Sequence, residues 1–358
     1  MKYQRHKFKY RWTLKDAAFS KDKGKVFSCF ACGGGSTMGY KLAGFDVIGC
    51  NEIDHRMMYT YCQNHNPRFN FLEPIQTFKM RDDLPEELYQ LDILDGSPPC
   101  STFSMSGSRE DAWGKMKHFR EGQAEQVLDT LFFDFIDLAK KLHPKVVIAE
   151  NVKGLLLGEA QKYVARIYEE FDKAGYMVQH WLLNGATMGV PQRRERVFFI
   201  CLRKDLCAPF LKQVNLFEEK PALEMEFNEA PILFGEFADF KGRLADSPVI
   251  KKLWDNRIRG DVSQGDANMR LFGKDSNFNQ HYVYLDKVAP TLASKESCLV
   301  HFEQPRFLSV MEVCCLSTFP QDYNFCGQSP HYVCGMSVPP LMMAQVSNQV
   351  WLQWLSKI

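Results

Sequence analysis

The sequence has no long hydrophobic run and almost no net charge. No apolar stretch reaches the roughly 20 residues that a membrane span needs, and the first residues are basic and polar, unlike a signal peptide. We therefore expect a cytoplasmic protein with no membrane partner. The net charge of +1 over 358 residues does not by itself indicate a nucleic-acid-binding protein. This length allows one large domain and a smaller one.

Cysteine pairs at metal-ligand spacing are scarce. Among twelve cysteines, only Cys29 with Cys32 and Cys314 with Cys315 lie close together. A zinc site needs two such pairs, or added histidines at ligand spacing. We therefore predict reduced thiols and no metal.

Positive charge is concentrated at the start of the chain. Nine Lys or Arg residues precede Val26, against only Asp16 and Asp22. Such an arm can neutralise phosphates of a nucleic acid. A solvated, partly disordered tail explains the same composition equally well, so both interpretations remain open.

Residues 25–203 alternate short apolar runs with amphipathic ones, which predicts an α/β fold with a parallel sheet and crossover helices. The apolar run 146–149 is typical of a strand with both faces covered. After about residue 205 this alternation is lost, which indicates a smaller irregular domain with short strands. The expected strands are 25–30, 45–50, 91–95, 146–149 and an antiparallel edge pair 176–183 and 196–202; the expected helices are 124–142, 159–174 and 339–358.

Cys100 is the strongest candidate for a nucleophile. It follows Pro98 and Pro99, which restrict the backbone, and it comes just after the strand 91–95. Ligands bind at the carboxyl ends of strands in such sheets. The alternative, a buried structural cysteine, is less consistent with the polar neighbours Ser97 and Ser101. The long aperiodic stretch 101–123 is predicted to be a lid over a substrate.

Three further candidate residues lie at the ends of other expected strands, namely Glu150, Arg194 and Arg196. Glu150 follows the run 146–149, where burial can raise a carboxyl pKa and let the group hold a proton. Strand alternation would send Arg194 and Arg196 to one face, suited to an exocyclic oxygen and a phosphate. The alternatives are a structural ion pair, such as one between Glu150 and Arg194, and a merely charged edge strand.

Glycines 33–35 follow the first expected strand and allow close approach of a ligand to the backbone. Glu52 ends the second strand, where an acid can accept hydrogen bonds from ribose hydroxyls. No phosphate-loop lysine and no third glycine at dinucleotide spacing are present. The pattern therefore favours a nucleoside-bearing cofactor without a pyrophosphate, such as S-adenosylmethionine, over a nicotinamide cofactor.

Taken together, these segments resemble the DNA cytosine-5 methyltransferases over most of the chain. The similar blocks are 30–35, Asn51-Glu52, 96–100, Glu150-Asn151-Val152, 192–196, the segment from Arg306 to Pro320, and 335–341. The resemblance implies a Rossmann-like S-adenosylmethionine-dependent domain at 1–205, a target-recognition domain at 206–300, and a segment 301–358 that completes the first domain.

The resemblance also implies the acceptor, the partners and the site residues. It implies methyl transfer from S-adenosylmethionine to C5 of a flipped cytosine in a specific sequence of double-stranded DNA, by an enzyme of the restriction-modification type. A cognate endonuclease is then a candidate partner, and its existence stays open. The near-neutral charge and the two-domain plan predict a monomer. The implied catalytic residues are Cys100, Glu150, Asn151, Arg194 and Arg196. The implied cofactor-binding residues are Phe30, Ala31, Gly33, Gly34, Gly35, Glu52, Ile53, Ile75, Pro98, Leu131, Ser337 and Val338.

Three positions depart from the family pattern. Cys32 replaces a common glycine, Pro74 replaces an aspartate that contacts adenine, and Met336 replaces an asparagine. Glu73 or a backbone carbonyl could take over from the missing aspartate. These departures leave a non-catalytic, cofactor-binding DNA regulator as one alternative. The tRNA-methylating branch of the same family is another.

The recognised DNA sequence cannot be read from the chain. Side chains in the expected target-recognition domain that could contact bases or phosphates are Arg257, Arg259, Asn268, Arg270, Lys274, Asn277 and Gln280.

Overall fold

The computed structural model describes residues 3–99, 116–117, 126–127, 130–158, 160–215, 218–274, 276 and 279–358. The chain forms two compact units, which are described separately. One consists of 1–17, 184–194 and 227–342 and is called the recognition unit, after the predicted target-recognition domain 206–300 that it overlaps. The other consists of 18–183, 195–226 and 343–358, here called the sheet unit. The assignment of residues 206–300 to a target-recognition domain stays a prediction, because a division into compact units does not show which residues recognise DNA.

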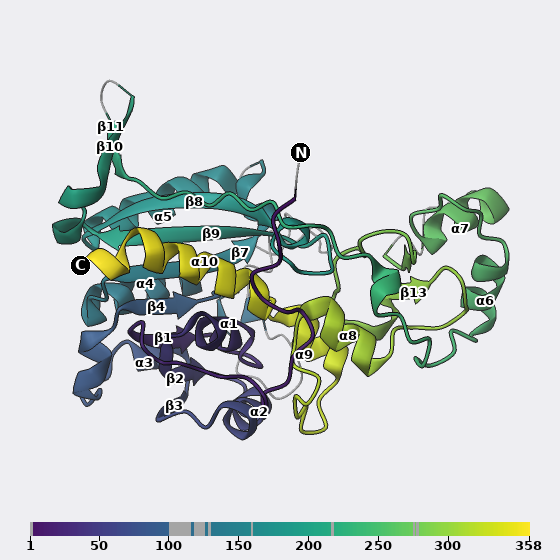
Figure 1. Ribbon diagram of the computed structural model, residues 1–358, viewed down its shortest axis with the longest axis horizontal. Coiled ribbons are helices and arrows are strands. Elements are labelled where there is room, and N and C mark those ends of the chain that lie inside the picture. Colours follow the sequence, from purple (N-terminus) through teal and green to yellow (C-terminus); the bar gives the residue numbers. More distant parts are fainter. Residues whose placement is uncertain are drawn as a thin grey trace. The chain divides into compact units, whose positions relative to one another are not determined.

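The sheet unit is built on a seven-stranded sheet with the order β3-β2-β1-β4-β7-β9-β8 (Figure 1). Neighbouring strands from β3 to β7 are parallel, and β9 is antiparallel to β7. This is the predicted α/β architecture, with β9 and β8 together at one edge. The strands are β1 (Lys25–Cys29), β2 (Asp46–Glu52), β3 (Phe69–Leu72), β4 (Ile93–Gly96), β7 (Val146–Val152), β8 (Tyr176–Asn184) and β9 (Glu195–Arg203).

Helices cover the sheet and bury its apolar side chains. Phe132 and Phe135 of α4, with Ile167 and Phe171 of α5, belong to one buried cluster that includes β1, β4, β7 and β9. Trp351 of α10 packs edge-on against Phe45. The helices are α1 (Gly35–Ala43), α2 (His55–His65), α3 (Ile75–Phe78), α4 (Leu131–Leu142), α5 (Ala160–Lys173) and α10 (Pro340–Gln353), the last of which begins in the recognition unit.

Residues next to the helix ends determine where several of these helices begin or stop. Gly44 ends α1 with φ 98°, a left-handed conformation that glycine adopts without strain. The Asp54 side chain accepts hydrogen bonds from Arg56 N and Met57 N and so caps α2. The helix expected over 124–142 begins only at Leu131, and 126–127 instead form β6, which pairs antiparallel with β5 (Met116–Lys117). Apolar spacing alone did not reveal this shorter start.

Two further strands, β10 (Leu211–Asn215) and β11 (Glu218–Pro221), form an exposed antiparallel pair in the sheet unit. No helix in the part of the chain that the structure describes is both long and apolar enough to cross a membrane.

The recognition unit is more helical than its sequence suggested. It contains α6 (Pro248–Asp255), α7 (Gln264–Phe272), α8 (Val310–Ser317) and α9 (Pro330–Met336), and the short parallel strands β12 (His281–Val283) and β13 (Leu299–His301). The prediction of an irregular region missed α6 and α7. Both carry recognisable start signals: Ser247 with Pro248 for α6, and a capping box of Ser263 and Asp266 for α7.

Candidate active site

Glu52 closes the loop that follows β1. Its carboxylate accepts hydrogen bonds from Cys32 N at 2.8 Å, Ile53 N at 2.8 Å and Asp54 N at 2.9 Å. Burial raises the pKa of this carboxyl, and the backbone N–H groups of Asp54 and Cys32 oppose that rise. The hydrogen bond from Cys32 thus fixes the glycine loop next to the buried Glu52 carboxylate at the end of β2.

The loop itself contains three left-handed residues. Phe30 has φ 55°, Cys32 has φ 46° and Gly34 has φ 77°. Left-handed backbone is strained for residues with a side chain, and such strain concentrates at functional sites. At Gly34 a Cβ atom would lie 2.2 Å from Nε2 of His65, so a larger residue could not fit without displacing that ring.

Glu150 and Arg196 form an ion pair on adjacent strands. Oε1 of Glu150 on β7 lies 2.8 Å from Nε of Arg196 on β9, and the two side chains are 10% and 15% exposed. Burial lowers the pKa of the Arg196 guanidinium, and the charge of Glu150 opposes that shift. Both predicted catalytic residues therefore lie together at the carboxyl end of β7.

Asn151 connects this end of β7 to the turn after β4. Its Nδ2 donates to the carbonyl of Pro98 at 3.1 Å, and its Oδ1 accepts from Val152 N at 2.8 Å. Pro98 stands two residues before Cys100 in the sequence. Cys100 itself and most of the predicted lid 101–123 lie outside the described residues.

Arg194 is placed by contacts within the recognition unit. Its side chain is 2% exposed, and it donates to the carbonyls of Leu292 at 3.0 Å, Gly335 at 3.0 Å and Ser337 at 3.1 Å. It lies just before β9 begins at Glu195, so strand alternation does not pair it with Arg196. The expected alternative ion pair of Glu150 is formed with Arg196 instead. The catalytic role of Arg194 stays a prediction.

Comparison with known proteins decides the family. The family model "C-5 cytosine-specific DNA methylase" matches residues 24–351. The chain belongs to the C-5 cytosine-specific DNA methylase family. The predicted family, the methyltransferase class and the S-adenosylmethionine cofactor are thereby confirmed.

Individual relatives match over different lengths. The type II methyltransferase M.DdeI of Desulfomicrobium norvegicum is 27% identical over 91% of this chain and 88% of its own length. The type II methyltransferase M.FnuDI of Fusobacterium nucleatum is 37% identical over 51% of this chain. The match spans only about half of that relative, 48%.

Solved structures confirm the fold. A DNA modification methyltransferase from an E. coli prophage has a TM-score of 0.63 at 19% identity, covering 92% of this chain and 99% of that one. DNMT2 of Spodoptera frugiperda has a TM-score of 0.60 at 16% identity, covering 91% and 99%. At these identities the likeness shows the Rossmann-like fold of the methyltransferases and nothing more.

The residues of this methylase fit its cofactor. Glu52 offers a buried carboxylate for ribose hydroxyls, beside a loop whose backbone is already held in place. In the recognition unit, the buried Oγ of Ser337 has no hydrogen-bond partner among the described residues, so it is available to a ligand. Ala31, Ile75, Leu131 and Val338 are buried apolar side chains, and Phe30 and Ile53 are half-buried.

The departure at Pro74 changes which group could contact adenine. The Glu73 carboxylate, an expected substitute, forms an ion pair with Arg81 at 2.9 Å. The Glu73 carbonyl accepts a hydrogen bond from Asn51 Nδ2 at 2.8 Å. Arg81 therefore competes with any cofactor amine for the Glu73 carboxylate.

Asp95 is a buried acid that the sequence analysis did not single out. Oδ2 accepts from Ser28 Oγ at 2.6 Å and Oδ1 accepts from Tyr40 Oη at 3.1 Å. Burial raises its pKa to about 7. Asp95 thus links β4, which leads to Cys100, with β1 and α1 on either side of the glycine loop. In the sequence, an acidic residue inside the otherwise apolar strand β4 could have indicated that Asp95 has a special role.

Several expected DNA-contacting side chains are already engaged inside the recognition unit. Arg257 donates to the carbonyl of Phe302 at 2.6 Å and lies 3.2 Å from the ring centre of Trp254. Arg270 forms a two-pronged ion pair with Asp261 at 2.6 and 2.7 Å. Asn277 lies outside the described residues. These contacts favour structural roles for Arg257 and Arg270.

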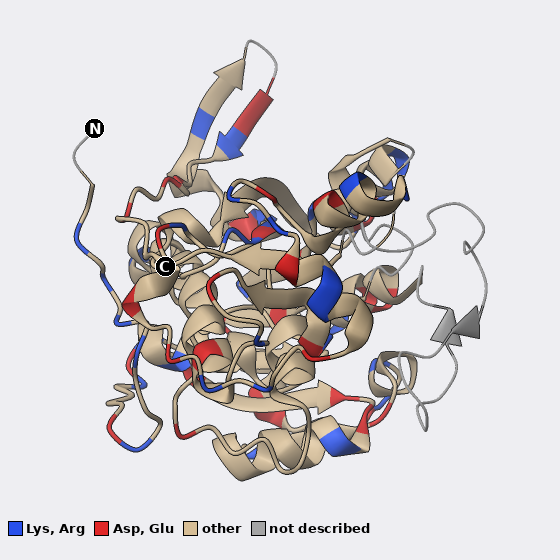
Figure 2. Cartoon of the chain, turned by 90° about the vertical axis from the view of Figure 1, so that its right-hand side faces the viewer, with Lys and Arg blue, Asp and Glu red and all other residues tan. Residues whose placement is uncertain are grey.

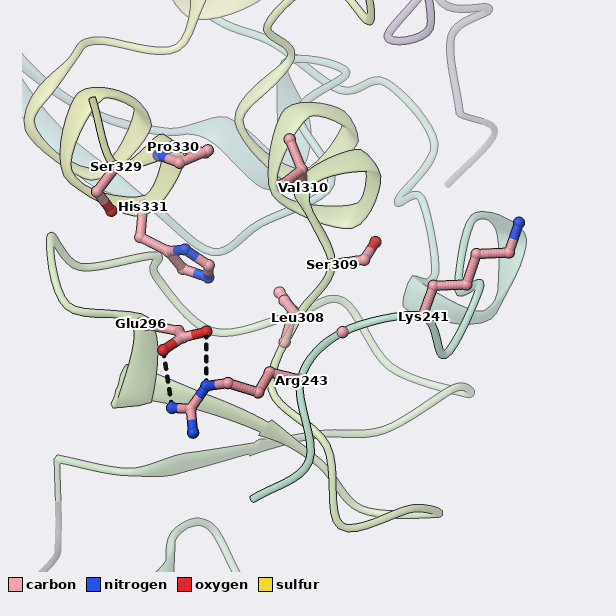
Figure 3. Close-up of a pocket in the computed structure, with 10 residues that line it drawn as sticks. Lys241, Arg243, Glu296, Leu308, Ser309, Val310, Ser329, Pro330 and His331 are labelled. Atoms are coloured by element: carbon pink, nitrogen blue, oxygen red, sulfur yellow. Dashed lines mark hydrogen bonds and ion pairs between the residues drawn. The ribbon is translucent and has the colours of Figure 1, made fainter. Parts of the chain in front are cut away.

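A pocket of about 400 Å³ lies in the recognition unit and contains none of the predicted site residues (Figure 3). Its polar lining includes Arg243, which is paired with Glu296 at 2.9 Å, and the buried His331. Across the described ranges, no group of three or more His, Cys, Asp or Glu side chains is arranged to hold a metal ion.

Proposed function

We propose that this chain methylates C5 of cytosine within a specific sequence of duplex DNA, through a covalent bond between Cys100 and C6. The observation that supports this most directly is the buried Glu150–Arg196 pair, since it places an acid and a guanidinium together beside a fixed turn. Family membership and the similarity to M.DdeI over 91% of this chain support DNA as the acceptor.

The protein groups have separate tasks in this reaction. The Cys100 thiolate attacks C6 of cytosine and forms a carbon–sulfur bond, which makes C5 nucleophilic. Glu150 binds the N3 edge and stabilises the charge that develops there by holding a proton at N3. Arg196 donates to the ring O2, and the ion pair fixes both side chains before the base arrives.

The remaining steps restore the aromatic ring. S-adenosylmethionine, when bound, would supply the methyl group: C5 takes it from the sulfonium sulfur, and the broken sulfur–carbon bond leaves S-adenosylhomocysteine. A base then removes the C5 proton, and the electrons of that bond expel the Cys100 thiolate from C6. None of these atoms can be reached inside a stacked duplex, so the cytosine must be flipped out.

Asn151 acts as a positioning residue in this scheme. Its hydrogen bond to the Pro98 carbonyl restrains the turn that leads to the nucleophile, and its neighbour Glu150 contacts the base. Arg194 ties together the backbone at Leu292, Gly335 and Ser337, the last of which is itself a predicted cofactor residue.

The biological setting forms part of the proposal. We infer a monomer that acts in the cytoplasm on double-stranded DNA, with residues 206–300 reading the sequence and the segment 101–123 covering the flipped base. The type II relatives support a restriction-modification role, in which a cognate endonuclease cuts DNA that lacks the methyl mark.

The decisive experiment is expression in a host free of cytosine methylation, beside a Cys100→Ala variant. Plasmid DNA is then sequenced after chemical conversion of unmethylated cytosines. Protected cytosines in one short motif, absent with the variant, would establish the activity, the modified atom and the specificity. Unprotected DNA from soluble protein, together with methylation of a tRNA substrate, would replace DNA by tRNA as the acceptor.

A covalent trap tests the mechanism separately. Duplex DNA with 5-fluorocytosine at the methylated position should form a stable adduct through Cys100, because fluorine cannot leave as a proton does. Cys100→Ser should abolish the adduct and methyl transfer while it spares cofactor binding. Methylation of ordinary DNA without any adduct on fluorinated DNA would remove the covalent step from the proposal.

A further inference from the structure

Residues 5–12 alternate strictly between basic and aromatic side chains. In the structure every basic member is exposed, whereas every aromatic member is half-buried. Successive basic residues are two positions apart, which places them at most about 7 Å from each other along the chain. The basic members are Arg5, Lys7, Lys9 and Arg11, and the aromatic members are His6, Phe8, Tyr10 and Trp12.

The aromatic face fastens this segment to the recognition unit. Trp12 Nε1 donates to the carbonyl of Thr318 at 2.9 Å, and Gln321 N donates to the carbonyl of Trp12 at 2.9 Å. The rings of Tyr10 and Phe237 lie edge to face with centres 6.1 Å apart. The segment is therefore held in place at its carboxyl end.

A second anchor lies near the other end. Gln4 N donates to the carbonyl of Asn228 at 2.8 Å. The buried carboxylate of Glu229 accepts from Lys7 N at 3.0 Å and lies 3.0 Å from His6 Nδ1. Because both ends are fixed, the backbone that carries the row of basic side chains is held in place without a ligand.

The Asp322 carboxylate binds the backbone just after this segment, and a backbone carbonyl binds the Arg11 side chain. Asp322 accepts from Leu14 N at 2.7 Å and Lys15 N at 3.0 Å, and Arg11 donates to the carbonyl of Glu236 at 2.8 Å. Within the described ranges, no ion pair joins Arg5, Lys9 or Arg11 to a carboxylate. Figure 2 shows basic residues at intervals along this first part of the chain.

The segment is also separate from the part of the chain that defines the family. The family model begins at residue 24, so residues 5–12 fall outside the match. Catalysis and cofactor binding therefore do not account for this alternation of basic and aromatic residues.

We propose that Arg5, Lys7, Lys9 and Arg11 form a basic arm that binds phosphate groups along the backbone of duplex DNA. A row of evenly spaced cations on a fixed backbone fits a polyanion whose charges repeat along its length. Binding releases counterions and does not depend on base sequence. The arm would hold non-specific DNA and strengthen the specific complex. This inference rests on the proposed function, because it takes duplex DNA as the acceptor.

The salt dependence of DNA binding tests the arm. The variant R5Q/K7Q/K9Q would be compared with K140Q/K162Q/K212Q, which removes the same charge from exposed lysines of the sheet unit. Affinity for a short duplex of mixed sequence would be measured between about 50 and about 200 mM salt. Each lost phosphate contact should lower the slope of log K against log salt by about 0.9, or about 2.7 for the arm variant.

The outcomes separate the arm from the proposed function. A slope that falls by about 2.7 in the arm variant and by less than about 1 in the control would support the arm. Equal slopes in the two variants would overturn it. Methyl transfer by each variant to specific duplex DNA at low salt should persist in either case. Its absence from the wild-type protein would instead contradict duplex DNA as the acceptor.

Discussion

Nε of Arg196 lies 2.8 Å from Oε1 of Glu150, and the ion pair that joins them bridges two adjacent antiparallel strands. Removing one partner of a buried ion pair leaves the other charge uncompensated, which costs about 3–5 kcal/mol. The pair therefore couples the stability of this part of the sheet to the chemistry proposed for it.

Replacement of Glu150 by Gln tests the acid. Glu150→Gln should lower the single-turnover rate of methyl transfer by roughly 10²–10⁴-fold, because the amide cannot hold a proton at cytosine N3. Calorimetry should show nearly unchanged binding of S-adenosylmethionine. Glu195→Gln is a control on the same strand as Arg196, since Glu195 of β9 pairs at 2.8 Å with Lys153, which directly follows β7. Equal rates for Glu150→Gln and the wild type would make Glu150 structural.

Replacement of Asn151 tests the restraint on the turn before Cys100. Asn151→Ala removes the hydrogen bond to the Pro98 carbonyl, worth about 1 kcal/mol, and should lower kcat roughly fivefold to tenfold. Asn151→Asp keeps the acceptor for Val152 N but loses the donor, so it should behave like Asn151→Ala. Rapid-quench measurements of methyl transfer would show this. Wild-type kinetics in Asn151→Asp would assign the effect to the acceptor side instead.

Replacement of Cys32 tests whether the backbone of the glycine loop is strained. Its φ of 46° favours glycine, so Cys32→Gly should raise the free energy of unfolding by about 0.5–1 kcal/mol. Cys32→Val should destabilise the protein, because a β-branched residue tolerates this backbone poorly. Urea denaturation under reducing conditions would compare the three proteins. A less stable Cys32→Gly protein would show that the thiol packing outweighs the backbone strain.

Titration of Asp95 should make the free energy of unfolding depend on pH. Its pKa of about 7 in the folded state exceeds the ordinary value of 3.8, so between these values the folded state keeps a proton that the unfolded state has released. The free energy of unfolding contributed by Asp95 is therefore greatest below pH 3.8 and falls as the pH rises to about 7.

Asp95→Asn removes this titration. Relative to the wild type, the variant should gain about 3 kcal/mol in the free energy of unfolding between about pH 5 and about pH 8. Ser28, Tyr40 and the charge of Glu150 face the same carboxyl and remain in both proteins. Chemical denaturation across this range measures the difference. A constant difference would mean that Asp95 does not titrate there.

Replacement of Arg194 tests whether its side chain has a structural role or contacts DNA. Arg194→Lys keeps the charge but cannot reach three carbonyls with a planar group, so it should destabilise the protein by about 2 kcal/mol. The salt slope of DNA binding should stay the same for Arg194→Met and the wild type. A decrease in that slope of about 0.9 would show a phosphate contact instead.

Much of the sheet unit could be predicted because its signals are local. Apolar runs such as Val146 to Ala149 mark strands, and Gly44 and Gly175 end helices near the expected positions. The start of α4 could not be predicted, because the same apolar spacing continues across 126–127, which pair with another strand. Helices α6 and α7 were missed for the opposite reason: capping signals were present but no long apolar period accompanied them.

The site was only partly predictable. The order of Cys100, Glu150 and Arg196 in the sequence indicated the chemistry, since each follows or begins a strand. Alternation could not decide which arginine meets Glu150, because Arg194 precedes β9 and its direction depends on carbonyls about a hundred residues away or more. Asp95 was overlooked because its pKa depends on burial by three separate elements.

By itself the sequence indicated the family, the cofactor class and the parallel sheet, and it predicts the reacting groups, because these follow from residue types and their order along the chain. Only the tertiary structure decided the pairing of Glu150 with Arg196, the bond from Asn151 to the Pro98 carbonyl, and the anchoring of the basic arm through its aromatic face. Those features arise where distant segments meet, and burial there sets distances, charges and hydrogen-bond partners that no local pattern contains.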